Sequence, residues 1–322
     1  MIPDPLRVLC IGDNRPGHEK QTQAMLDAFG KRAPVEFRWF RVPDGRRFAS
    51  VSRLQALVAE ILPVSADGIL ESWGWNTKAF HPHLVMATGS HTHGALLVLG
   101  RYYRARTLVC MTPDFFVRKT VDRILSPMHD GKEEDSRLRV TLGPPCRQIV
   151  RDKRCLDRGL ILVGGTDASS HVWDTGQLMK AIGDVLNQSP MDSWEIGSSP
   201  RTPEETERVL AEYARERPDV SFQPFSVAPR GWVEQAYARS TEVWISADSI
   251  SMVYEALTAG CRVGILPVQW RKRKNKFQKS LDFLHAKGWV VYPGEMFKED
   301  MPLLDEAGRA AEEAVTEWWG KK

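Results

Sequence analysis

LRVLCIG at residues 6–12 and LILVGG at residues 160–165 are short apolar runs, and each opens a series in which strands alternate with helices. A continuous apolar run bounded by turn residues is typical of a strand buried on both faces of a parallel sheet. After the first run, the pattern predicts a helix from about Gln21 to Phe29. Repeated strand–helix alternation predicts the α/β class, with helices on both faces of each sheet. The other predicted strands are 35–40, 84–88, 107–111 and 121–125 in the first series, and 193–196, 220–222, 242–246, 262–266 and 289–291 in the second.

The alternation breaks once, around Gly143-Pro144-Pro145, and a basic connector follows at 147–159. We therefore predict an N-terminal Rossmann-like lobe at 1–147 and a C-terminal Rossmann-like lobe at 148–300. The apolar residues of 301–322 fall on one helical face, which predicts a closing helix packed on one of the lobes. In this architecture the expected ligand site is the cleft between the lobes, at the carboxyl ends of the strands.

Composition narrows the class of protein. The 322 residues include 44 basic and 41 acidic side chains, a net charge of +3, which is too balanced for a dedicated nucleic-acid binder. No apolar run reaches the length of about 18 residues that a membrane-spanning helix needs, and the first residues lack the charge order of a signal peptide. We therefore expect a cytoplasmic protein. The five cysteines are scattered without a C-x-x-C pair, so we expect reduced thiols.

The strongest local signal is SADSISMVYEALTAG at 246–260, where a strand turns into a helix. Free N–H groups and a partial positive charge at a helix start favour a phosphate, and small hydroxyl residues let it approach closely. Glu255 follows Ser251 by one helical turn, where its carboxylate is suited to ribose hydroxyls. An ordinary capped helix with a surface glutamate remains the alternative. The candidates here are Ser246, Asp248, Ser249, Ser251, Met252 and Glu255.

A second signal is GDNRPGHEKQ at 12–21, directly after the first strand. Gly12 and Gly17 permit close backbone approach, and His18 at the junction of loop and helix is suited to act as a general base near neutral pH. His18 stands where a P-loop requires lysine, and the spacing is not G-x-G-x-x-G, so neither nucleotide-binding fingerprint is present. A histidine that merely caps the helix is the alternative.

Two loops of the second lobe add candidates for binding a diphosphate or its sugar. Gly164, Gly165 and Thr166 follow the strand at 160–165, and Arg201 in GSSPRTPEET is suited to contact an anion. The structural alternatives are a tight turn at Gly164–Thr166 and an ordinary helix start after Arg201.

The histidines at 81, 83, 91 and 93 suggest a metal site, but no nearby carboxylate or cysteine set accompanies them. His91 and His93, placed at the start of a helix, would point about 200° apart. No D-x-D pair exists in the chain. We therefore predict no metal, with helix ends and basic side chains supplying the positive charge. The run Arg271–Lys279 holds six basic residues and predicts either a solvated face or peripheral contact with phosphates or an anionic membrane.

Six segments in this order resemble the family named for mitochondrial fission, the elongated-mitochondria family, over about residues 8–280. The segments are DNRPGHEKQT, TGSHTH, SPMHDG, LVGGTD, SSPRTP and ADSISMVYEALTAG. The family is similar to GT-B glycosyltransferases, in which the C-terminal lobe holds the donor nucleotide. It also looks distantly like the N-acetylglucosaminyltransferase that forms lipid II. Two departures are that the first loop begins GDN and that TGSHTHG carries two histidines, which puts the acceptor preference in doubt.

The resemblance implies a role for each candidate. His18 would be the base or a group that orients the acceptor, Ser249 and Ser251 would hold the diphosphate, and Glu255 would hold the ribose. Residues Gly164, Gly165, Thr166 and Arg201 would line the donor pocket, and Asn275 and Gln278 would contact the transferred sugar. The residues expected around the acceptor are Gly12, Asp13, Gly17, Gly89, Ser90, His129 and Asp130.

These observations predict an inverting, metal-independent glycosyltransferase without a cofactor, which moves a sugar from a nucleoside-diphosphate donor to a cell-envelope glycan or a lipid-linked acceptor. It would work in the cytoplasm or on the inner face of the membrane, without a nucleic-acid partner. A nucleotide-sugar epimerase on the same scaffold is an alternative, with Asp114, His129, Asp130 and Glu133 as its acid and base groups. A non-catalytic membrane-associated or nucleotide-binding protein is the third possibility, since a fold does not fix a function.

Overall fold

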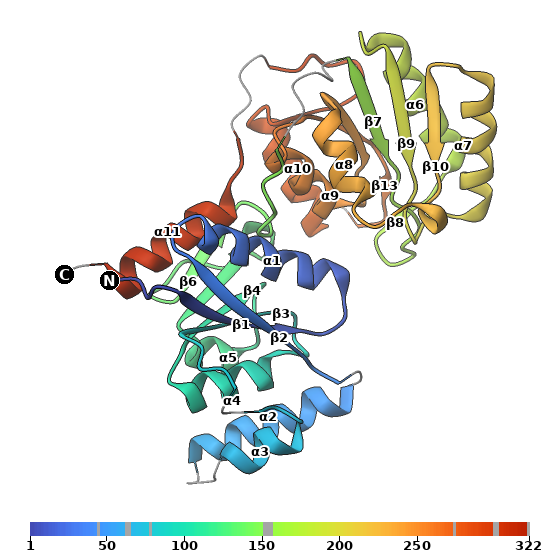
Figure 1. Ribbon diagram of the computed structural model, residues 1–322. Helices are drawn as coiled ribbons and strands as arrows, with labels where there is room; N and C mark the ends of the chain where they lie inside the picture. The colour runs from blue at the N-terminus through green and yellow to red at the C-terminus, as the bar shows by residue number, and fades with distance from the viewer. Residues whose placement is uncertain are drawn as a thin grey trace. The chain divides into compact units, whose positions relative to one another are not determined.

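The computed structural model describes residues 1–43, 46–61, 66–76, 79–150, 157–272, 275–298 and 303–320. The chain forms two compact units, one of Met1–Arg147 with Asp305–Lys322 and the other of Gln148–Leu304 (Figure 1). Each unit contains a six-stranded sheet whose paired strands are all parallel.

The first unit has the strand order β2-β1-β3-β4-β5-β6. Its strands are β1 (Leu6–Gly12), β2 (Val35–Arg41), β3 (Leu84–Thr88), β4 (Arg106–Cys110), β5 (Arg123–Pro127) and β6 (Leu138–Thr141). Its helices are α1 (Pro16–Gly30), α2 (Arg46–Ile61), α3 (Ala66–Ser72), α4 (His93–Tyr103), α5 (Phe115–Thr120), the short 3₁₀ turn η1 (Met128–Asp130) and α11 (Glu306–Trp319).

Strand β1 shows why this sheet is covered on both faces. Its side chains alternate in direction, so Val8 and Cys10 pack in one core with α1 and α11, while Leu9 and Ile11 pack in the other with α4. Ala307, Ala310, Ala311 and Ala314 of α11 belong to the first of these cores, and α11 lies beside α1 (Figure 1). The C-terminal helix is thus part of the first unit.

The second unit has the strand order β10-β9-β7-β11-β12-β14. Its strands are β7 (Arg158–Leu162), β9 (Ser193–Gly197), β10 (Val220–Gln223), β11 (Glu242–Ser246), β12 (Arg262–Leu266) and β14 (Val290–Val291), with β8 (His171–Val172) and β13 (Gln269–Trp270) forming a small antiparallel pair. Its helices are α6 (Thr175–Gln188), α7 (Glu204–Glu216), α8 (Trp232–Arg239), α9 (Ile250–Thr258) and α10 (Lys276–Ala286), with the 3₁₀ turn η2 (Phe225–Val227). Helices α6 and α7 cover one face of the sheet, and α8, α9 and α10 the other (Figure 1).

The α/β class and the two parallel sheets predicted from the alternation are confirmed. Several boundaries were wrong. Helix α1 begins at Pro16 rather than near Gln21, because its first turn is polar and carries no apolar periodicity. The strand predicted at 160–165 ends at Leu162, which leaves Gly164 and Gly165 in the loop after it. The sequence pattern did not predict β6 or the β8–β13 pair, since four-residue and two-residue strands give little alternation.

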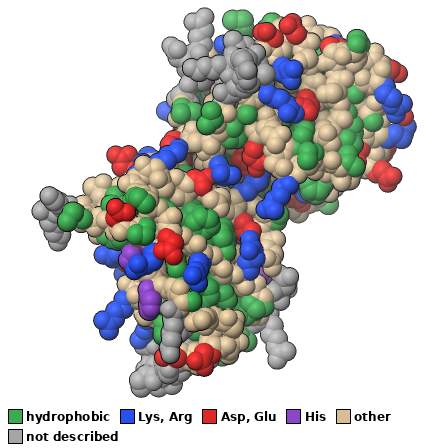
Figure 2. Space-filling view, viewed as in Figure 1, with side chains coloured by type: hydrophobic (Ala, Val, Ile, Leu, Met, Phe, Trp, Pro, Cys, Tyr) green, Lys and Arg blue, Asp and Glu red, His purple; other side chains and the backbone are tan. Residues whose placement is uncertain are grey.

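Charges of both signs are distributed over the surface. Lys and Arg side chains are interspersed with Asp and Glu side chains over the face seen in Figure 2, in keeping with the net charge of +3. Within the described ranges, no helix is both long and apolar enough to cross a membrane.

Candidate functional site

In the first unit, Asp13 and His18 form a close pair at the carboxyl end of β1. The Nδ1 of His18 lies 2.8 Å from Oδ2 of Asp13, whose side chain is 1% exposed. A carboxylate only accepts hydrogen bonds, so Nδ1 carries the donated proton and Nε2 presents its lone pair. No hydrogen-bond partner of Nε2 is found among the residues that the structure describes. The contact fixes the orientation of the imidazole, as a buried carboxylate does in hydrolytic triads.

The main chain around His18 is shaped to hold this ring. Pro16 occupies the start of α1, where its fixed φ suits a helix and no N–H is needed. Gly89 has φ +90°, and a Cβ on it would lie 2.3 Å from Nδ1 of His18, so only glycine leaves room for the imidazole. At Gly12 a Cβ would lie 2.5 Å from Oε1 of Glu19, the end of a flexible side chain, so this glycine is less strictly required. A Cβ on Gly17 would meet nothing, so Gly17 has no steric reason to be glycine.

The two histidines after β3 do not lie together at the start of a helix, as the sequence had suggested. His93 is the first residue of α4 and is buried, while His91 lies before the helix, so the two do not share a helix start.

His81 and His83, which precede β3, both make hydrogen bonds to Arg7. The His81 carbonyl accepts from Nε of Arg7 at 2.7 Å, and the Arg7 N–H donates to Nδ1 of His83 at 3.1 Å. Burial and the Arg7 charge lower the pKa of His83. Among the described residues, no group of three or more His, Cys, Asp or Glu is arranged to hold a metal ion.

The remaining acceptor-side candidates of the first unit lie on two loops. Ser90 follows β3, and its carbonyl accepts from Nη2 of Arg53 at 3.1 Å. His129 and Asp130 form η1 after β5, and Oδ2 of Asp130 accepts from the Thr112 hydroxyl at 2.9 Å. Because β1, β3 and β5 are parallel members of one sheet, these loops all leave from its carboxyl edge.

In the second unit, Asp248 connects three of the predicted donor loops. Its side chain is 1% exposed and accepts from the N–H of Gly165 at 3.1 Å and from the Ser246 hydroxyl at 2.7 Å. Nη2 of Arg201 lies 2.7 Å from Oδ2 of Asp248 and 3.3 Å from Oγ of Ser249. Arg201, predicted as an anion contact, thus shares its charge with a buried carboxylate, while 44% of its side chain stays exposed.

The two glycines after β7 are required by packing. A Cβ on Gly164 would lie 2.2 Å from Oδ2 of Asp248, and one on Gly165 would lie 2.0 Å from the backbone of Arg201. The Gly164 N–H donates to Ser246 Oγ at 2.7 Å, and the N–H of Thr166 donates to the Arg201 carbonyl at 3.0 Å. The glycine-rich segment, the Arg201 loop and the start of α9 therefore form one hydrogen-bonded cluster at the carboxyl edge of the sheet.

Helix α9 begins in this cluster. Ser249 occupies the N-cap position, and its hydroxyl does not cap the helix N–H groups. The first N–H groups of a helix lack intrahelical partners, so this end can accept an anion. Ser251 is exposed, whereas Met252 and Glu255 are half-buried further into the helix. The Met252 carbonyl accepts from the Tyr237 hydroxyl at 3.2 Å.

The last predicted donor contacts lie at the start of α10. The side-chain oxygen of Asn275 caps this helix by accepting from the Phe277 N–H at 2.8 Å, so only its amide N–H groups remain for a ligand. Oε1 of Gln278 is buried without a partner among the described residues. In the basic run, Arg271, Lys272, Lys276 and Lys279 are exposed, and residues 273–274 lie outside the described residues.

Sequence reasoning missed several members of these clusters. Ser199 and Thr202 both donate to the Gly164 carbonyl, and Nε2 of His171 lies 3.0 Å from the Gly165 carbonyl. In the first unit, Arg53 was not considered as a site residue, and His93 was considered only as one of four histidines for a metal. The hydrogen-bond partners of these residues are distant in sequence. The only sequence signal for them was therefore the frequency of hydroxyl side chains in the loops after the strands.

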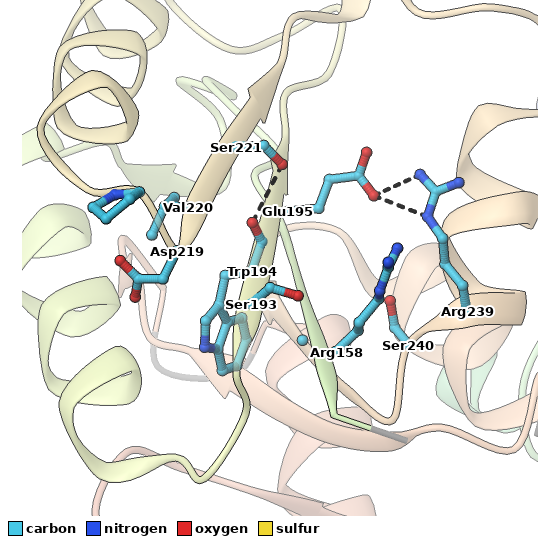
Figure 3. Close-up of a pocket in the computed structure, with 11 residues that line it drawn as sticks. Arg158, Ser193, Trp194, Glu195, Asp219, Val220, Ser221, Arg239 and Ser240 are labelled. Atoms are coloured by element: carbon cyan, nitrogen blue, oxygen red, sulfur yellow. Dashed lines mark hydrogen bonds and ion pairs between the residues drawn. The ribbon is translucent and has the colours of Figure 1, made fainter. Parts of the chain in front are cut away.

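A hollow of about 290 Å³ opens elsewhere in the second unit (Figure 3). It lies at the amino ends of β7, β9 and β10, and Glu195 in its wall is paired with Arg239 at 2.6 Å. No predicted site residue lines it. Ligands of open α/β sheets bind at the carboxyl ends, so this hollow lies at the opposite edge from the candidate site.

Solved structures of other proteins resemble this chain over nearly its whole length. The chain resembles the UDP-GlcNAc 2-epimerase from Methanocaldococcus jannaschii with a TM-score of 0.54 and 10% identity, covering 96% of this chain and 98% of that one. It resembles the UDP-GlcNAc 2-epimerase from Neisseria meningitidis bound to UDP-GlcNAc with a TM-score of 0.50 and 12% identity, covering 98% and 100%. The likeness concerns the fold, which is of the GT-B type.

Sequence comparison gives the family. No curated protein matches the chain in sequence. The family model described as "Mitochondrial fission ELM1" matches residues 16–318, which includes α1 with His18, every strand after β1 and nearly all of α11. This match confirms the resemblance found from the six segments, and the chain belongs to the mitochondrial fission ELM1 family.

Proposed function

We propose that the protein is a glycosyltransferase that moves a sugar from a nucleoside-diphosphate donor to an acceptor hydroxyl. The observation that carries this proposal is the 2.8 Å pair of Asp13 and His18, which leaves Nε2 of an oriented imidazole available as a base. The second support is the cluster around Asp248, which brings the start of α9 together with Gly164 and Arg201. The third is the fold, which the chain shares with an enzyme solved with UDP-GlcNAc.

Each group has a defined task in this reaction. Nε2 of His18 takes the proton of the acceptor hydroxyl as its oxygen bonds to the anomeric carbon. The bond between that carbon and the diphosphate oxygen breaks, and attack from the face opposite the leaving group inverts the anomeric configuration. The start of helix α9 at Ser249 and Ser251 stabilises the departing diphosphate electrostatically, a contribution that is usually large. Glu255 binds the ribose, Arg201 and Thr166 line the donor pocket, and Asn275 and Gln278 contact the transferred sugar. No metal or cofactor takes part.

The acceptor in this proposal is a glycan or a lipid-linked saccharide. The exposed side chains Arg271, Lys272, Lys276 and Lys279 would hold the protein against an anionic membrane on its cytoplasmic face. Co-sedimentation with vesicles containing anionic phosphatidylglycerol, compared with neutral phosphatidylcholine vesicles, tests this part separately. Loss of sedimentation when the four residues are neutralised supports it, and equal sedimentation with both vesicles contradicts it.

The main experiment measures nucleoside-diphosphate release from a panel of nucleotide sugars in the presence of saccharide acceptors. The compared proteins are the wild type, His18→Ala, Glu255→Ala and the control His91→Ala, whose residue lies outside α4. We expect His18→Ala to lose turnover while it still binds donor, and Glu255→Ala to lose donor affinity. If no donor binds the wild type, or if both variants turn over like it, the proposal is wrong.

An epimerase is the second candidate, because both solved structures named above are UDP-GlcNAc 2-epimerases. Incubating the protein with donor alone separates the two reactions. An epimerase forms the epimeric sugar without acceptor, whereas the proposed transferase leaves the donor configuration unchanged until an acceptor hydroxyl is added.

A further inference from the structure

Two polar side-chain atoms in the first unit are buried without a partner in the described part of the chain, and both lie beside the base candidate. Nε of Arg53 and Nδ1 of His93 have no hydrogen-bond partner. His93 is 3% exposed, and His18, Arg53 and Asp114 are all close enough for their charges to act on its ring. Buried polar groups in proteins are nearly always paired, so we look for the partner of these two atoms outside the described side chains.

The fold holds these two residues firmly. A Cβ on Gly94 would lie 2.4 Å from Oγ of Ser52 and 2.6 Å from the Arg53 nitrogen, so α2 and α4 approach closely just beside His93. Nη2 of Arg53 then donates to the Ser90 carbonyl at 3.1 Å and pairs with Oδ2 of Asp114 at 3.1 Å. With Nη2 engaged in this way, the position of the guanidinium is fixed while its Nε–H still lacks an acceptor.

His93 differs chemically from His18. Burial and the positive charge of Arg53 lower the pKa of His93 to about 4, with Asp114 opposing them and His18 adding to them. The ring is therefore neutral at physiological pH, with one nitrogen that donates and one that accepts. It is suited to bind a hydroxyl, and it is not suited to remove a proton from one.

The charges around the cluster balance. Asp13 and Asp114 supply two negative charges, and Arg15 and Arg53 supply two positive charges, each guanidinium lying within 3.8 Å of one of the carboxylates. A phosphate or carboxylate would enter a region with no excess positive charge. A sugar hydroxyl both donates and accepts, so it can satisfy the Arg53 donor and the His93 ring together.

We propose that Arg53 and His93 form a subsite that binds the hydroxyls of a neutral sugar ring in the acceptor and positions it for His18. The subsite is assigned to the acceptor on the strength of the function proposed above. It identifies the reacting end of the acceptor as a saccharide rather than a phosphate headgroup. Arg53 and His93 are positioning residues in this proposal, and the proton goes to His18.

The test measures binding without donor, so it does not depend on turnover. The probes are neutral p-nitrophenyl glycosides of common hexoses, monitored by saturation-transfer NMR, with decyl phosphate as the anionic comparison. The proteins are the wild type, His93→Ala, His93→Asn, Arg53→Lys and the control His91→Ala. Asn keeps a polar group near the position of Nδ1, and Lys keeps the charge of residue 53 but lacks its Nε–H.

We expect at least one glycoside to bind the wild type and the His91→Ala control equally. His93→Ala and Arg53→Lys should each weaken that glycoside about tenfold, as expected when a buried polar group loses its partner, and His93→Asn should restore part of the loss. In turnover assays the acceptor KM should rise while kcat falls less. Folding of the first unit is checked by circular dichroism and thermal unfolding of each variant, and the donor affinity should not change.

Three results would overturn the subsite. These are failure of every glycoside to bind the wild type, unchanged glycoside affinity in folded His93→Ala and Arg53→Lys, and decyl phosphate binding that these two variants weaken while glycosides are unaffected. If glycosides bind as expected but no nucleotide sugar is turned over, the transferase proposal fails and the saccharide subsite stands.

Discussion

The imidazole of His18 receives its orientation from Asp13, five residues earlier in the chain, through a 2.8 Å contact from Nδ1 to Oδ2. The Asp13 side chain is 1% exposed and that of His18 is 19% exposed, so the carboxylate is buried and the ring extends toward solvent. This is the relationship expected of a base and its orienting group. In the proposed transferase, turnover therefore depends on both residues and on the packing that holds them in place.

Asp13→Asn should reduce kcat strongly while leaving donor affinity unchanged. Asparagine can donate as well as accept, so the ring can turn over or adopt the tautomer with Nε2–H, in which it is no longer a base. Positioned general bases contribute about 10²- to 10⁴-fold, which sets the expected range of the loss. Steady-state kinetics measure the loss of kcat, with Glu19→Gln, next to His18 on α1, as control. Unchanged kcat in Asp13→Asn would show that the pair is structural.

Gly89→Ala should abolish turnover and destabilise the first unit by about 1–3 kcal/mol. The residue has φ +90°, and its new Cβ would lie 2.3 Å from the His18 ring. Denaturant unfolding and turnover are measured together. The control is Gly68→Ala at an exposed position of helix α3, where a Cβ meets nothing and alanine should stabilise slightly. Full activity in Gly89→Ala would mean that His18 does not act from its position beside this glycine.

Gly165→Ala should damage the second unit more than Gly164→Ala. At Gly165 the new Cβ meets the backbone of Arg201 at 2.0 Å, whereas at Gly164 it meets side-chain atoms of Asp248 and Ser249, which shift more readily than a backbone. Overpacking of this kind costs about 1–3 kcal/mol. Gly183→Ala in α6 is the matched control, since nothing lies near its Cβ. Thermal unfolding ranks the variants, and the reverse order would contradict the packing described.

Stability should fall as the pH falls from about 6.5 to 4, and part of that loss should disappear in His93→Gln. The pKa of His93 is lowered from 6.5 to about 4 in the folded protein, so in this window the unfolded chain binds more protons than the folded one. By linkage, unfolding becomes easier as the pH drops, by up to about 3 kcal/mol from this residue. Urea unfolding at pH 7, 6 and 5 measures how steeply the free energy of unfolding changes with pH. An identical slope in the variant would contradict the burial of a neutral His93.

Thiol reagents should leave Cys10 and Cys110 unlabelled in the native protein at pH 8. Burial raises the pKa of the Cys10 thiol, and it raises the pKa of Cys110 to about 12 against the effect of a hydrogen bond from Thr88, so neither forms the reactive thiolate. Cys155 lies outside the described residues, so the experiment uses Cys155→Ser. Mass spectrometry after labelling gives the sites. Rapid modification of Cys10 or Cys110 would show that the first sheet opens readily.

The candidate site was predictable where its chemistry is local. The hydroxyl-rich segment before α9 and the glycine-histidine loop after β1 are continuous in sequence, and a helix follows each of them as predicted, although α1 begins at Pro16 rather than near Gln21. The link from Asp248 to Gly165 and Arg201 was not predictable, because it spans 83 and 47 residues and depends on the order in which β7, β9 and β11 pair.

The sequence by itself determined the α/β class and the family. Both follow from properties of neighbouring residues, which are the continuous apolar runs of the strands, the periodicity of the helices and the order of the motifs. Only the tertiary structure decided that Gly89 makes room for His18, that His93 is buried neutral and that Arg53 lies beside it. Burial and charge environment depend on which distant segments pack together, and a sequence pattern records only what each segment presents.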